Sequence, residues 1–351
     1  MKDLAKRFPS NPILLPKDIA PSDSSLQVIC LLNPGVFRFD GKIWLLVRVA
    51  ESKAQKEGFV FFPVISEFGK LEVLEVDIND PDLISTDARV MNYRGLDYLT
   101  TVSHLRFLSS EDGIHFTQSD EYPPLFGMGE LERFGIEDCR VSKIDGVFYL
   151  TYTAVSASGV GVGLRTTTDW RNFSLPKMIL PPHNKDCAMF DRKIDGKFFA
   201  LHRPSSKEIG GNFIWLCDSI DGERWGNHKC IIRTRGGMWD SGRVGAGAAP
   251  IWTDSGWLAI YHGADEKNRY CLGAFLLDLQ NPAIVLGRTV DPIMVPSETY
   301  ELSGFFGEVV FTNGHIVEGD KLIIYYGAAD EFVCGAVLSI ARVLEQTISV
   351  K

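Results

Sequence analysis

The sequence lacks the features that mark membrane and nucleic-acid-binding proteins. None of its uncharged apolar runs approaches the roughly 18 residues that a membrane-spanning helix requires. It has no dense run of Lys and Arg, and its net charge is −9, so a surface that follows nucleic-acid phosphates is not expected. The opening MKDLAKRFPSNPILLPKD is too polar and too often interrupted by Pro for a signal peptide. We therefore expect a cytoplasmic protein with small-molecule partners.

Paired cysteines are also missing. There is no C-x-x-C pair, and the number of cysteines is odd, with scattered positions: Cys30, Cys139, Cys187, Cys217, Cys230, Cys271 and Cys334. Free thiols in a reducing compartment explain this pattern better than a disulfide framework or a zinc site does. The sequence therefore predicts neither disulfides nor a metal.

Apolar residues at helical spacing are scarce outside the C-terminal ARVLEQ segment, and a different pattern recurs instead. Its five copies are FRFDGKIWLLVR, SKIDGVFYLTYT, RKIDGKFFALHR, WTDSGWLAIYHG and IVEGDKLIIYYG. Each copy reads as a strand, a tight turn of the Asp-Gly type and a second strand rich in β-branched and aromatic residues. In the first three copies the interval from the turn glycine to the last residue is the same. The pattern predicts five related β-hairpins.

Five hairpins in 351 residues leave about 70 residues for each unit, which is enough for a four-stranded sheet. We therefore predict an all-β fold, a five-bladed β-propeller forming a single domain over residues 1–351 with short N- and C-terminal extensions. A β-sandwich could use as many strands, but it does not predict one recurring hairpin. A smaller motif, SSEDGIHF, TTTDWRNF and DSIDGERW, predicts outer-strand turns in which Asp caps the turn and an aromatic side chain fills a gap between sheets.

Polar residues stand at the ends of the predicted strands, and in a propeller equivalent strand ends meet near the axis. The beginnings of strands carry Asn33, Glu137, Asp138, Lys185, Asp186 and Glu308, and the ends carry Arg48, Arg203, Tyr261, His262 and Asp330. A charge beside a buried strand needs a partner. Two interpretations stay open. These residues are either ion pairs, such as Arg48 with Asp138 and Arg203 with Asp186, or a site for a polyhydroxylated substrate accompanied by an anion.

Two other segments carry polar or aromatic residues that either contact the substrate or have a purely structural role. Trp239, in the Gly-rich GGMWDSGRVGAG, either stacks on a sugar or packs against its surroundings, and Asp240 and Arg243 beside it are a candidate ion pair. His104 and Arg106 in SHLRF either line the site or have their polar groups satisfied within the core.

Four long segments resemble glycoside hydrolase family 130, the mannoside phosphorylases and β-mannosidases. They are FGIEDCRVSKIDG, NKDCAMFDRKIDGKFFALHRP, WDSGRVGAGAAPIWTDSGWLAIYHGAD and GFFGEVVFTNGHIVEGDKLIIYYGAAD, in the family's order from about Asn33 to about Asp330. The resemblance implies a five-bladed propeller and inverting cleavage of β-mannosidic bonds without a metal or organic cofactor. The SHLR and GFFGEVVF segments look closest to the branch that acts on β-1,2-linked mannose.

The resemblance also implies roles for particular residues. Asp138 looks like the proton donor, whose proton reaches the leaving oxygen through a hydroxyl of the bound mannose. The phosphate-binding group would be Arg48, Lys185, Arg203, Tyr261 and His262. Asn33 and Asp330 look like mannose ligands, and we also expect substrate contacts from Arg106, Glu137, Asp186, Trp239 and Glu308. The chain departs from the family pattern at Cys139, where Pro is usual, and at Asp191-Arg192, which we expect to add an acid and a base near the phosphate group.

Phosphorolysis and hydrolysis make different demands on such a site. An inverting hydrolase needs an acid and a base roughly 6.5–9.5 Å apart so that water fits between base and sugar. A phosphorylase needs the acid and a group of cations that holds inorganic phosphate as the co-substrate. The cations here favour phosphorolysis, giving α-mannose 1-phosphate, whereas Glu308 is a candidate base for hydrolysis. A carbohydrate-binding propeller without catalysis is the third possibility, and a homo-oligomer is compatible with all three.

Overall fold

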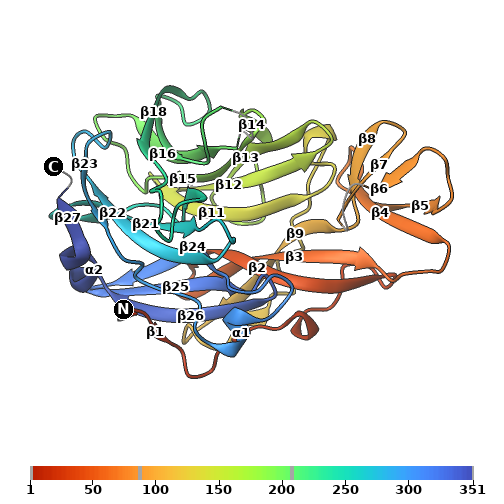
Figure 1. Ribbon diagram of the computed structural model, residues 1–351, viewed down its shortest axis with the longest axis horizontal. Coiled ribbons are helices and arrows are strands. Elements are labelled where there is room, and N and C mark those ends of the chain that lie inside the picture. Colours follow the sequence, from red (N-terminus) through yellow and green to blue (C-terminus); the bar gives the residue numbers. More distant parts are fainter. Residues whose placement is uncertain (1–2, 86–88, 206–208, 350–351) are drawn as a thin grey trace.

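The protein is built mainly from antiparallel β-sheets (Figure 1). The computed structural model describes residues 3–85, 89–205 and 209–349. Five sheets have four strands or more, and two smaller sheets have two and three. The helices of the described residues are short: η1 (Pro16–Asp18), η2 (Glu130–Glu132), α1 (Thr299–Leu302) and α2 (Ile340–Gln346). The all-β prediction is confirmed, and α2 contains the ARVLEQ segment. None of these helices has the length and apolar character needed to cross a bilayer.

The five larger sheets follow one another along the chain, and we number them 1 to 5 by their first strand. Sheet 1 contains β2 (Leu26–Phe39), β3 (Lys42–Lys53), β9 (Val102–Ser110) and β10 (Thr117–Gln118). Sheet 2 contains β11 (Ile136–Ile144), β12 (Val147–Ser156), β13 (Gly159–Thr167) and β14 (Lys177–Leu180). Sheet 3 contains β15 (Asn184–Met189), β16 (Phe198–Pro204), β17 (Ile214–Ser219) and β18 (Gly226–Ile232).

The last two sheets recruit strands from the ends of the chain. Sheet 4 contains β19 (Arg243–Ala246), β21 (Gly256–Ala264), β22 (Tyr270–Leu277), β23 (Val285–Thr289) and β27 (Thr347–Ser349), with β20 (Ile251–Thr253) also paired to β21. Sheet 5 contains β24 (Val310–Glu318), β25 (Lys321–Ala328), β26 (Phe332–Ser339) and β1 (Lys6–Arg7). Strands from both ends of the chain thus complete neighbouring sheets.

The recurring hairpin supplies the first two strands of sheets 1, 2, 3 and 5. Asp40, Asp145 and Asp195 have φ values of 48°, 50° and 49°, and each is followed by a glycine that also has a positive φ. Two such residues in a row are typical of the type I′ turn, whose twist matches that of the strands it joins. The fourth copy differs, because it forms β20 and β21, whereas β19 is the first strand of sheet 4.

The smaller motif lies between the third and fourth strands of sheets 1, 2 and 3, as predicted. The side chains of Asp112, Asp169 and Asp221 each accept hydrogen bonds from backbone N–H groups two and three residues further on. The aromatic residue that ends the first copy, Phe116, packs edge-on against Tyr325 of sheet 5, with 5.4 Å between the ring centroids. The motif therefore caps a turn and fills a gap between neighbouring sheets.

The hydrophobic core is divided among the contacts between sheets. Five clusters of buried residues each join two sheets that are neighbours in the order 1–2–3–4–5–1. Representative pairs are Leu46 with Phe148, Val162 with Met189, Leu201 with Val244, Leu258 with Leu322, and Tyr325 with Leu45. Because the last pair joins sheet 5 to sheet 1, the contacts close into a ring.

An arm that the sequence reading did not anticipate is inserted between β3 and β9. It consists of β4 (Phe59–Ile65) paired with β5 (Leu71–Asp77), and of β6 (Leu83–Ser85), β7 (Val90–Tyr93) and β8 (Leu96–Leu99). Figure 1 shows it projecting from one end of the molecule. Its base packs on sheet 2, where Val64 joins Phe134 and Val155 in one buried cluster. The hairpin count alone gave no sign of this insertion.

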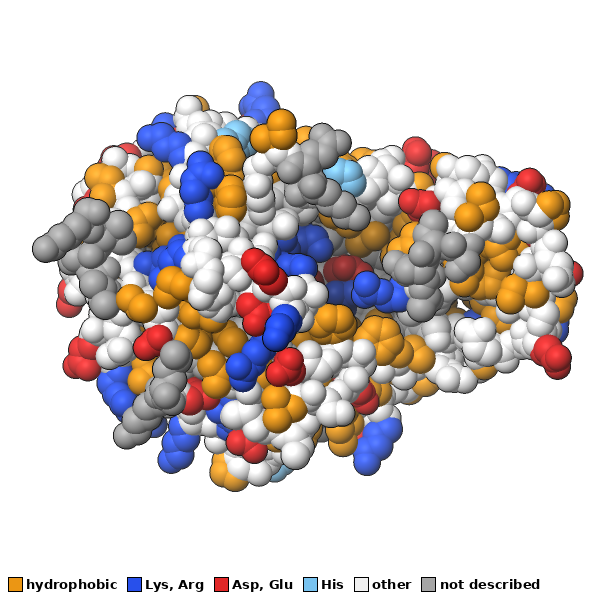
Figure 2. Space-filling view, viewed as in Figure 1, with side chains coloured by type: hydrophobic (Ala, Val, Ile, Leu, Met, Phe, Trp, Pro, Cys, Tyr) orange, Lys and Arg blue, Asp and Glu red, His pale blue; other side chains and the backbone are white. Residues whose placement is uncertain are grey.

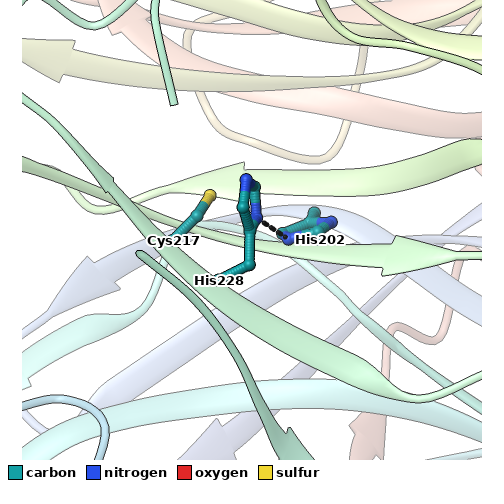
Figure 3. A group of neighbouring side chains, drawn as sticks. All are labelled: His202, Cys217 and His228. Atoms are coloured by element: carbon teal, nitrogen blue, oxygen red, sulfur yellow. Dashed lines mark hydrogen bonds between the residues drawn. The ribbon is translucent and has the colours of Figure 1, made fainter. Parts of the chain in front are cut away.

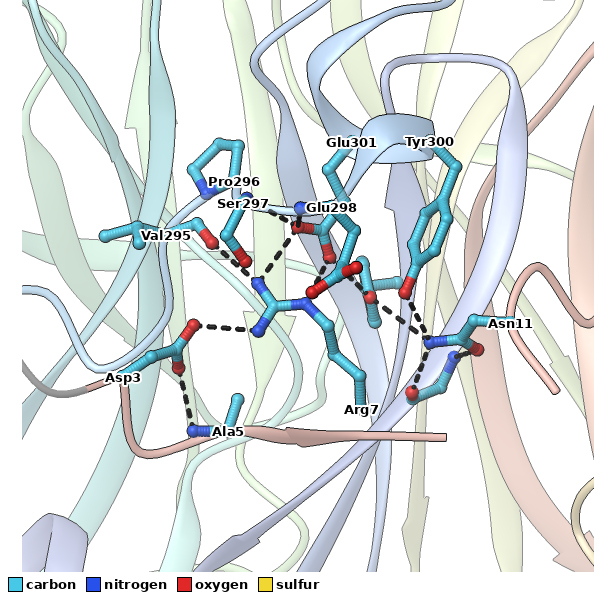
Figure 4. Close-up of polar contacts among 12 residues, drawn as sticks. Asp3, Ala5, Arg7, Asn11, Val295, Pro296, Ser297, Glu298, Tyr300 and Glu301 are labelled. Carbon is cyan, nitrogen blue, oxygen red and sulfur yellow. Dashed lines mark hydrogen bonds and ion pairs between the residues drawn. The ribbon is translucent and has the colours of Figure 1, made fainter. Parts of the chain in front are cut away.

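An ion pair joins the N-terminal segment to the helix α1 (Figure 4). Arg7 donates from Nε and Nη2 to both carboxylate oxygens of Glu301, at 2.7 and 2.9 Å. The hydroxyl of Tyr326 donates to the same carboxylate at 2.7 Å, and the backbone N–H of Ser297 donates at 2.8 Å. The Glu301 side chain is fully buried. Paired, two-point contact of this kind is among the stronger polar interactions in proteins.

We expect Arg7→Met to destabilise the protein strongly, because it leaves the buried Glu301 carboxylate without its cation. Breaking a buried pair from one side costs about 3–5 kcal/mol. Urea unfolding measures the loss. Arg38→Met breaks the exposed pair with Glu318 and serves as the control, with an expected loss below about 1 kcal/mol. Equal losses in the two variants would contradict the assignment.

Candidate active site

A cavity of about 610 Å³ opens among the ends of the inner strands, and eight of the predicted site residues line it. These are Asn33, Arg48, Glu137, Asp138, Lys185, Asp186, Arg203 and Asp330. Figure 2 shows a hollow on the viewed face in which basic and acidic side chains gather. The lining also includes residues of sheet 4, such as Arg243 and Tyr270, and residues of the arm. Strand ends from all five sheets thus meet in one place.

A bulge at equivalent positions of four first strands turns polar side chains toward this cavity. The register shifts in β2 between Leu32 and Gly35, in β11 between Glu137 and Arg140, in β15 between Lys185 and Ala188, and in β24 between Thr312 and Gly314. A bulge inserts an unpaired residue and redirects the side chains around it. Asp138 and Asp186 occupy matching bulge positions with φ of 50° and 54°, a left-handed conformation that Asp tolerates better than most residues.

Arg48 joins sheet 1 to both acids of sheet 2. Its Nη2 donates to Glu137 Oε1 at 2.6 Å, and its Nη1 donates to Asp138 Oδ1 at 3.1 Å. Asn33 Nδ2 donates to the same Asp138 oxygen at 3.1 Å. Burial opposes ionisation of Asp138, but Arg48, Arg140 and Asn33 together outweigh it and hold the pKa of this carboxyl below its usual value. A general acid needs a proton to donate, whereas the cations around Asp138 favour its charged form.

Asp186 forms a second buried ion-pair cluster. Arg203 Nε donates to Asp186 Oδ2 at 2.5 Å, and Arg140 Nη2 donates to Asp186 Oδ1 at 3.3 Å. His262 Nε2 lies 3.3 Å from the same carboxylate. Burial raises the pKa of Asp186, but Arg203, His262 and Arg140 more than offset this and lower the pKa well below its usual value. Both ion pairs proposed from the sequence, Arg48 with Asp138 and Arg203 with Asp186, are therefore present, and both lie at the cavity wall.

Lys185 differs from its neighbours because its cation has no partner among the residues that the structure describes. Within the parts of the chain that the structure describes, its ammonium group makes no hydrogen bond or ion pair, although it lines the cavity beside Arg203. Burial, followed by repulsion from Arg203, lowers the pKa of Lys185 despite the opposing effect of Asp186 and Glu137. A partly buried cation without a counter-ion is costly unless an anion binds to it.

Asp330 brings a further carboxyl to the cavity, from the loop after β25. Burial is the main cause that raises the pKa of Asp330 to about 6, and the nearby Asp138 and Glu137 add to it against the effect of Arg48. Its φ of 52° shows that its backbone is also left-handed. Asp138 and Asp330 therefore share one cavity with pKa values shifted in opposite directions.

Tyr261, His262 and Trp239 do not line the cavity. The Tyr261 hydroxyl donates to the buried Asp240 at 2.8 Å, and Trp239 Nε1 donates to the backbone carbonyl of Val290 at 2.9 Å while its ring packs against Tyr261. His262 lies behind the cavity wall, where its Nε2 is 3.3 Å from the Asp186 carboxylate. The packing interpretation of Trp239 matches this position, and direct ligand contacts from these three residues remain predictions.

Arg106 and Glu308 also lie outside the lining. Arg106 Nε donates to His104 Nε2 at 2.8 Å within the core, which matches the core-satisfied interpretation of this pair. The Glu308 side chain is 53% exposed and lies 3.8 Å from Arg269 Nε. Glu308 is therefore exposed and does not line the cavity, and its role in binding stays a prediction.

The suggested pairing of Asp240 with Arg243 is wrong. Asp240 pairs instead with Arg235 and Arg288, which come from a loop and from β23. Arg243 lines the cavity, where its Nη1 donates to the Tyr270 hydroxyl at 3.0 Å. Proximity in the sequence was misleading here because the tight turn sends the two side chains in different directions.

Aromatic side chains at the cavity are the main feature that the sequence reading missed. Phe305, Phe306, Tyr270 and Phe311 line it, and Phe311 stacks on His262 with 4.0 Å between centroids. Phe305 and Phe306 are 50% and 43% exposed, which is unusual for such large apolar side chains. Two adjacent Phe residues in the Gly-containing GFFGEVVF segment were a usable signal for a sugar-stacking surface.

Comparison with known proteins identifies the family. A family model described as β-1,4-mannooligosaccharide phosphorylase matches residues 82–348. The chain belongs to glycoside hydrolase family 130. The β-1,2-mannobiose phosphorylase of Listeria innocua is 43% identical over 97% of each chain, and one from Thermoanaerobacter is 33% identical over 85% of this chain and 96% of that protein. A solved structure of the Listeria innocua enzyme in complex with β-1,2-mannobiose aligns with a TM-score of 0.91 at 42% identity, covering 97% and 98% of the two chains.

The family 130 assignment that four sequence segments suggested is thus confirmed, but one expectation drawn from the family pattern is wrong. Asp191 and Arg192 do not lie near the cations of the large cavity. They line a separate cavity of about 300 Å³, together with Trp252 and His315, where the Arg192 guanidinium lies 5.2 Å from the Trp252 ring. They follow β15 near the hairpin turn, whereas Lys185 lies at the other end of that strand.

In this family 130 protein we expect Asp330→Asn to increase the free energy of unfolding relative to wild type at high pH but not at low pH. The pKa of Asp330 is raised to about 6, so the folded protein holds this proton more tightly than the unfolded chain does. The resulting penalty on the folded state is present above pH 6 and disappears below about pH 4. A shift of about two units corresponds to at most ~3 kcal/mol.

Thermal unfolding of wild type and Asp330→Asn between pH 4 and pH 8 measures this effect. The variant should gain stability relative to wild type as pH rises, whereas Asp191→Asn, outside the cavity, should not show this trend. A constant difference across the pH range would contradict the raised pKa of Asp330.

Proposed function

We propose that this protein cleaves β-1,2-mannobiose by inverting phosphorolysis, giving α-mannose 1-phosphate and mannose. Support comes from 43% identity to a β-1,2-mannobiose phosphorylase over nearly the whole of both chains. The observation in the structure that carries the proposal is Lys185, a cation beside Arg203 that has no partner among the described residues, in a cavity that also holds Asp138.

We further propose that the chain forms one domain, a five-bladed β-propeller in which sheets 1 to 5 are the blades. The ring of apolar clusters supports this, because each sheet packs against the next and sheet 5 packs against sheet 1. The cavity lies where the first strands approach one another, as expected near a propeller axis.

The proposed place for phosphate is beside Lys185 and Arg203. A phosphate dianion would give the Lys185 ammonium the counter-ion that the described residues do not supply. The guanidinium of Arg203 is fixed by Asp186 through Nε, so its position is defined before the anion binds. Preorganised cations of this kind stabilise the charge of a phosphate nucleophile without reorganisation during the reaction.

Asp138 is the proposed proton donor. Its proton passes to the leaving glycosidic oxygen, directly or through a mannose hydroxyl, as the bond from the anomeric carbon to that oxygen breaks. A phosphate oxygen bonds to the anomeric carbon from the opposite face, which inverts its configuration. Because a phosphate dianion would offset the cations that lower the pKa of Asp138, its binding should raise this pKa and favour the protonated form.

Water is the less favoured nucleophile. Glu308, the residue that could have activated water, is largely exposed and lies outside the cavity lining. Glu137 and Asp186, which do line the cavity, are each paired with an arginine. The cations beside them therefore suit an anionic nucleophile better than a neutral one.

Incubation of the protein with β-1,2-mannobiose, with and without inorganic phosphate, tests the proposal. We expect mannose 1-phosphate with phosphate and almost no cleavage without it. β-1,4-Mannobiose should be cleaved more slowly than β-1,2-mannobiose, although the description of the matching family model names a β-1,4-mannooligosaccharide phosphorylase. Mannose released equally well without phosphate would indicate a hydrolase, and no cleavage of either sugar would indicate a binding protein.

We expect Asp138→Asn to abolish most turnover while the fold is kept. The amide preserves the shape of the side chain but cannot donate a proton as an acid does, and general acid catalysis contributes about 10²–10⁴-fold to rate. The rate of mannose 1-phosphate formation measures the loss, and circular dichroism checks folding. Asp191→Asn, in the other cavity, is the control and should retain full activity. A well-folded, active Asp138→Asn enzyme would remove Asp138 from the mechanism.

We expect Lys185→Met to raise KM for phosphate by roughly 10–100-fold, because a charge-assisted hydrogen bond worth about 1.5–3 kcal/mol is lost. The KM for mannobiose should change much less. Steady-state rates at varied phosphate concentrations measure both values. The exposed Lys229→Met on β18 is the control. An unchanged phosphate KM in Lys185→Met would place the anion elsewhere.

A further inference from the structure

A second group of reactive side chains lies on sheet 3, away from the candidate active site. His202 of β16, Cys217 of β17 and His228 of β18 face one another on adjacent strands (Figure 3). Their ligand atoms all lie within 4.8 Å of one another. None of the three lines the 610 Å³ cavity. Because side chains alternate along a strand, His202 and the cavity residue Arg203 point to opposite faces of β16.

Hydrogen bonding fixes His202 in the form that a metal ligand requires. Its Nδ1 lies 3.0 Å from Asn184 Oδ1, an oxygen that can only accept, so Nδ1 carries the proton. The Nε2 atom is then left with a lone pair, which faces His228 Nδ1 at 3.0 Å. A ligating histidine in metal sites usually donates from its other nitrogen to a protein oxygen in this way. Asn184 thus supplies the supporting contact of a metal site.

Two of the three candidate ligands are buried and one is accessible to solvent. His202 and Cys217 are 2% and 1% exposed, whereas His228 lies at the surface. Cys217 is a free thiol, and its only hydrogen bond among the described residues is a 3.5 Å contact with the Ala200 carbonyl. A cation can therefore reach the cluster from solvent on the side of His228.

We propose that His202, Cys217 and His228 form a binding site for a divalent transition metal ion such as Zn²⁺. Two imidazoles and a thiolate are ligands that Zn²⁺ prefers, with bonds of about 2.0–2.3 Å and a fourth position for water. These bond lengths place the ligand atoms about 3.3–3.7 Å apart. His202 Nε2 and His228 Nδ1 already lie 3.0 Å apart. All the ligand atoms lie within 4.8 Å of one another, so rotations about side-chain bonds that move His228 Nδ1 and Cys217 Sγ by about 1 Å would complete the geometry.

Metal binding changes the protons of two of the ligands. His228 moves its proton from Nδ1 to Nε2, so that Nδ1 can coordinate, and Cys217 releases its proton to solvent as the thiolate binds. No oxidant or reductant takes part. The ion would join three adjacent strands of sheet 3, so binding should stabilise the folded protein.

Cobalt binding provides a direct test, because a thiolate bound to Co²⁺ gives a charge-transfer absorption in the near ultraviolet. We expect this band in the wild-type protein, saturating at one equivalent of Co²⁺ and lost on addition of Zn²⁺. Zn²⁺ alone, at a free concentration of about 100 times its Kd, should raise Tm by about 4 °C.

A variant of the exposed ligand His228 keeps the test independent of folding. His228→Ala changes an exposed side chain and should lose the band and the Tm shift, as should Cys217→Ser. His115→Ala, at another exposed histidine, and Cys230→Ser, at a partly buried cysteine on the same strand as His228, are the matched controls and should keep both. Absence of the band in the wild-type protein, or its persistence in a folded His228→Ala variant, would overturn the proposal. Phosphorolysis is not part of the readout, so failure of either proposal leaves the other testable.

Discussion

The cavity depends on buried carboxylates that stand on bulged first strands and are neutralised by arginines from adjacent strands. Asp138 and Asp186 hold left-handed backbone conformations at matching positions of β11 and β15, and Arg48 and Arg203 come from second strands. A regular ladder would alternate these side chains between the two faces of a sheet, and the bulge breaks that alternation. Arg48 crosses from sheet 1 to sheet 2, so it also fixes how two neighbouring sheets approach each other.

These buried ion pairs contribute little to the free energy of unfolding, although they contain many charges. Buried ion pairs lose much of their attraction to desolvation, and apolar side chains of similar size often serve stability equally well. The left-handed conformation adds strain at both aspartates. Such costs are tolerated where they position reactive groups, and the apolar clusters between all five sheets provide the compensating stability.

The sequence predicted local features well and distant pairings less well. The tight turns are specified by adjacent residues, so the five hairpins and the meeting of polar strand ends could be inferred, although the fourth hairpin joins β20 to β21 and leaves out the first strand of its sheet. The arm formed by β4–β8 contains no copy of the repeated hairpin pattern, so the repeat did not predict it. Asp240 pairs with Arg235 and Arg288 rather than with Arg243, because burial and strand direction decided these contacts. The His202, Cys217 and His228 cluster draws one residue from each of three strands, and no spacing motif marks it.

The pairing of β1 with β26 has a consequence for biogenesis. Lys6 lies opposite Val337, so β1 cannot pair with β26 until the chain between the two strands has been synthesised, and this delays completion of sheet 5. At synthesis rates of about 5–20 residues per second, this delay is on the order of 20–60 seconds. Once β26 has formed, its free edge could accept the β1 segment of another copy of the chain instead of its own. Domain exchange between copies is therefore the characteristic assembly error to which this chain is exposed.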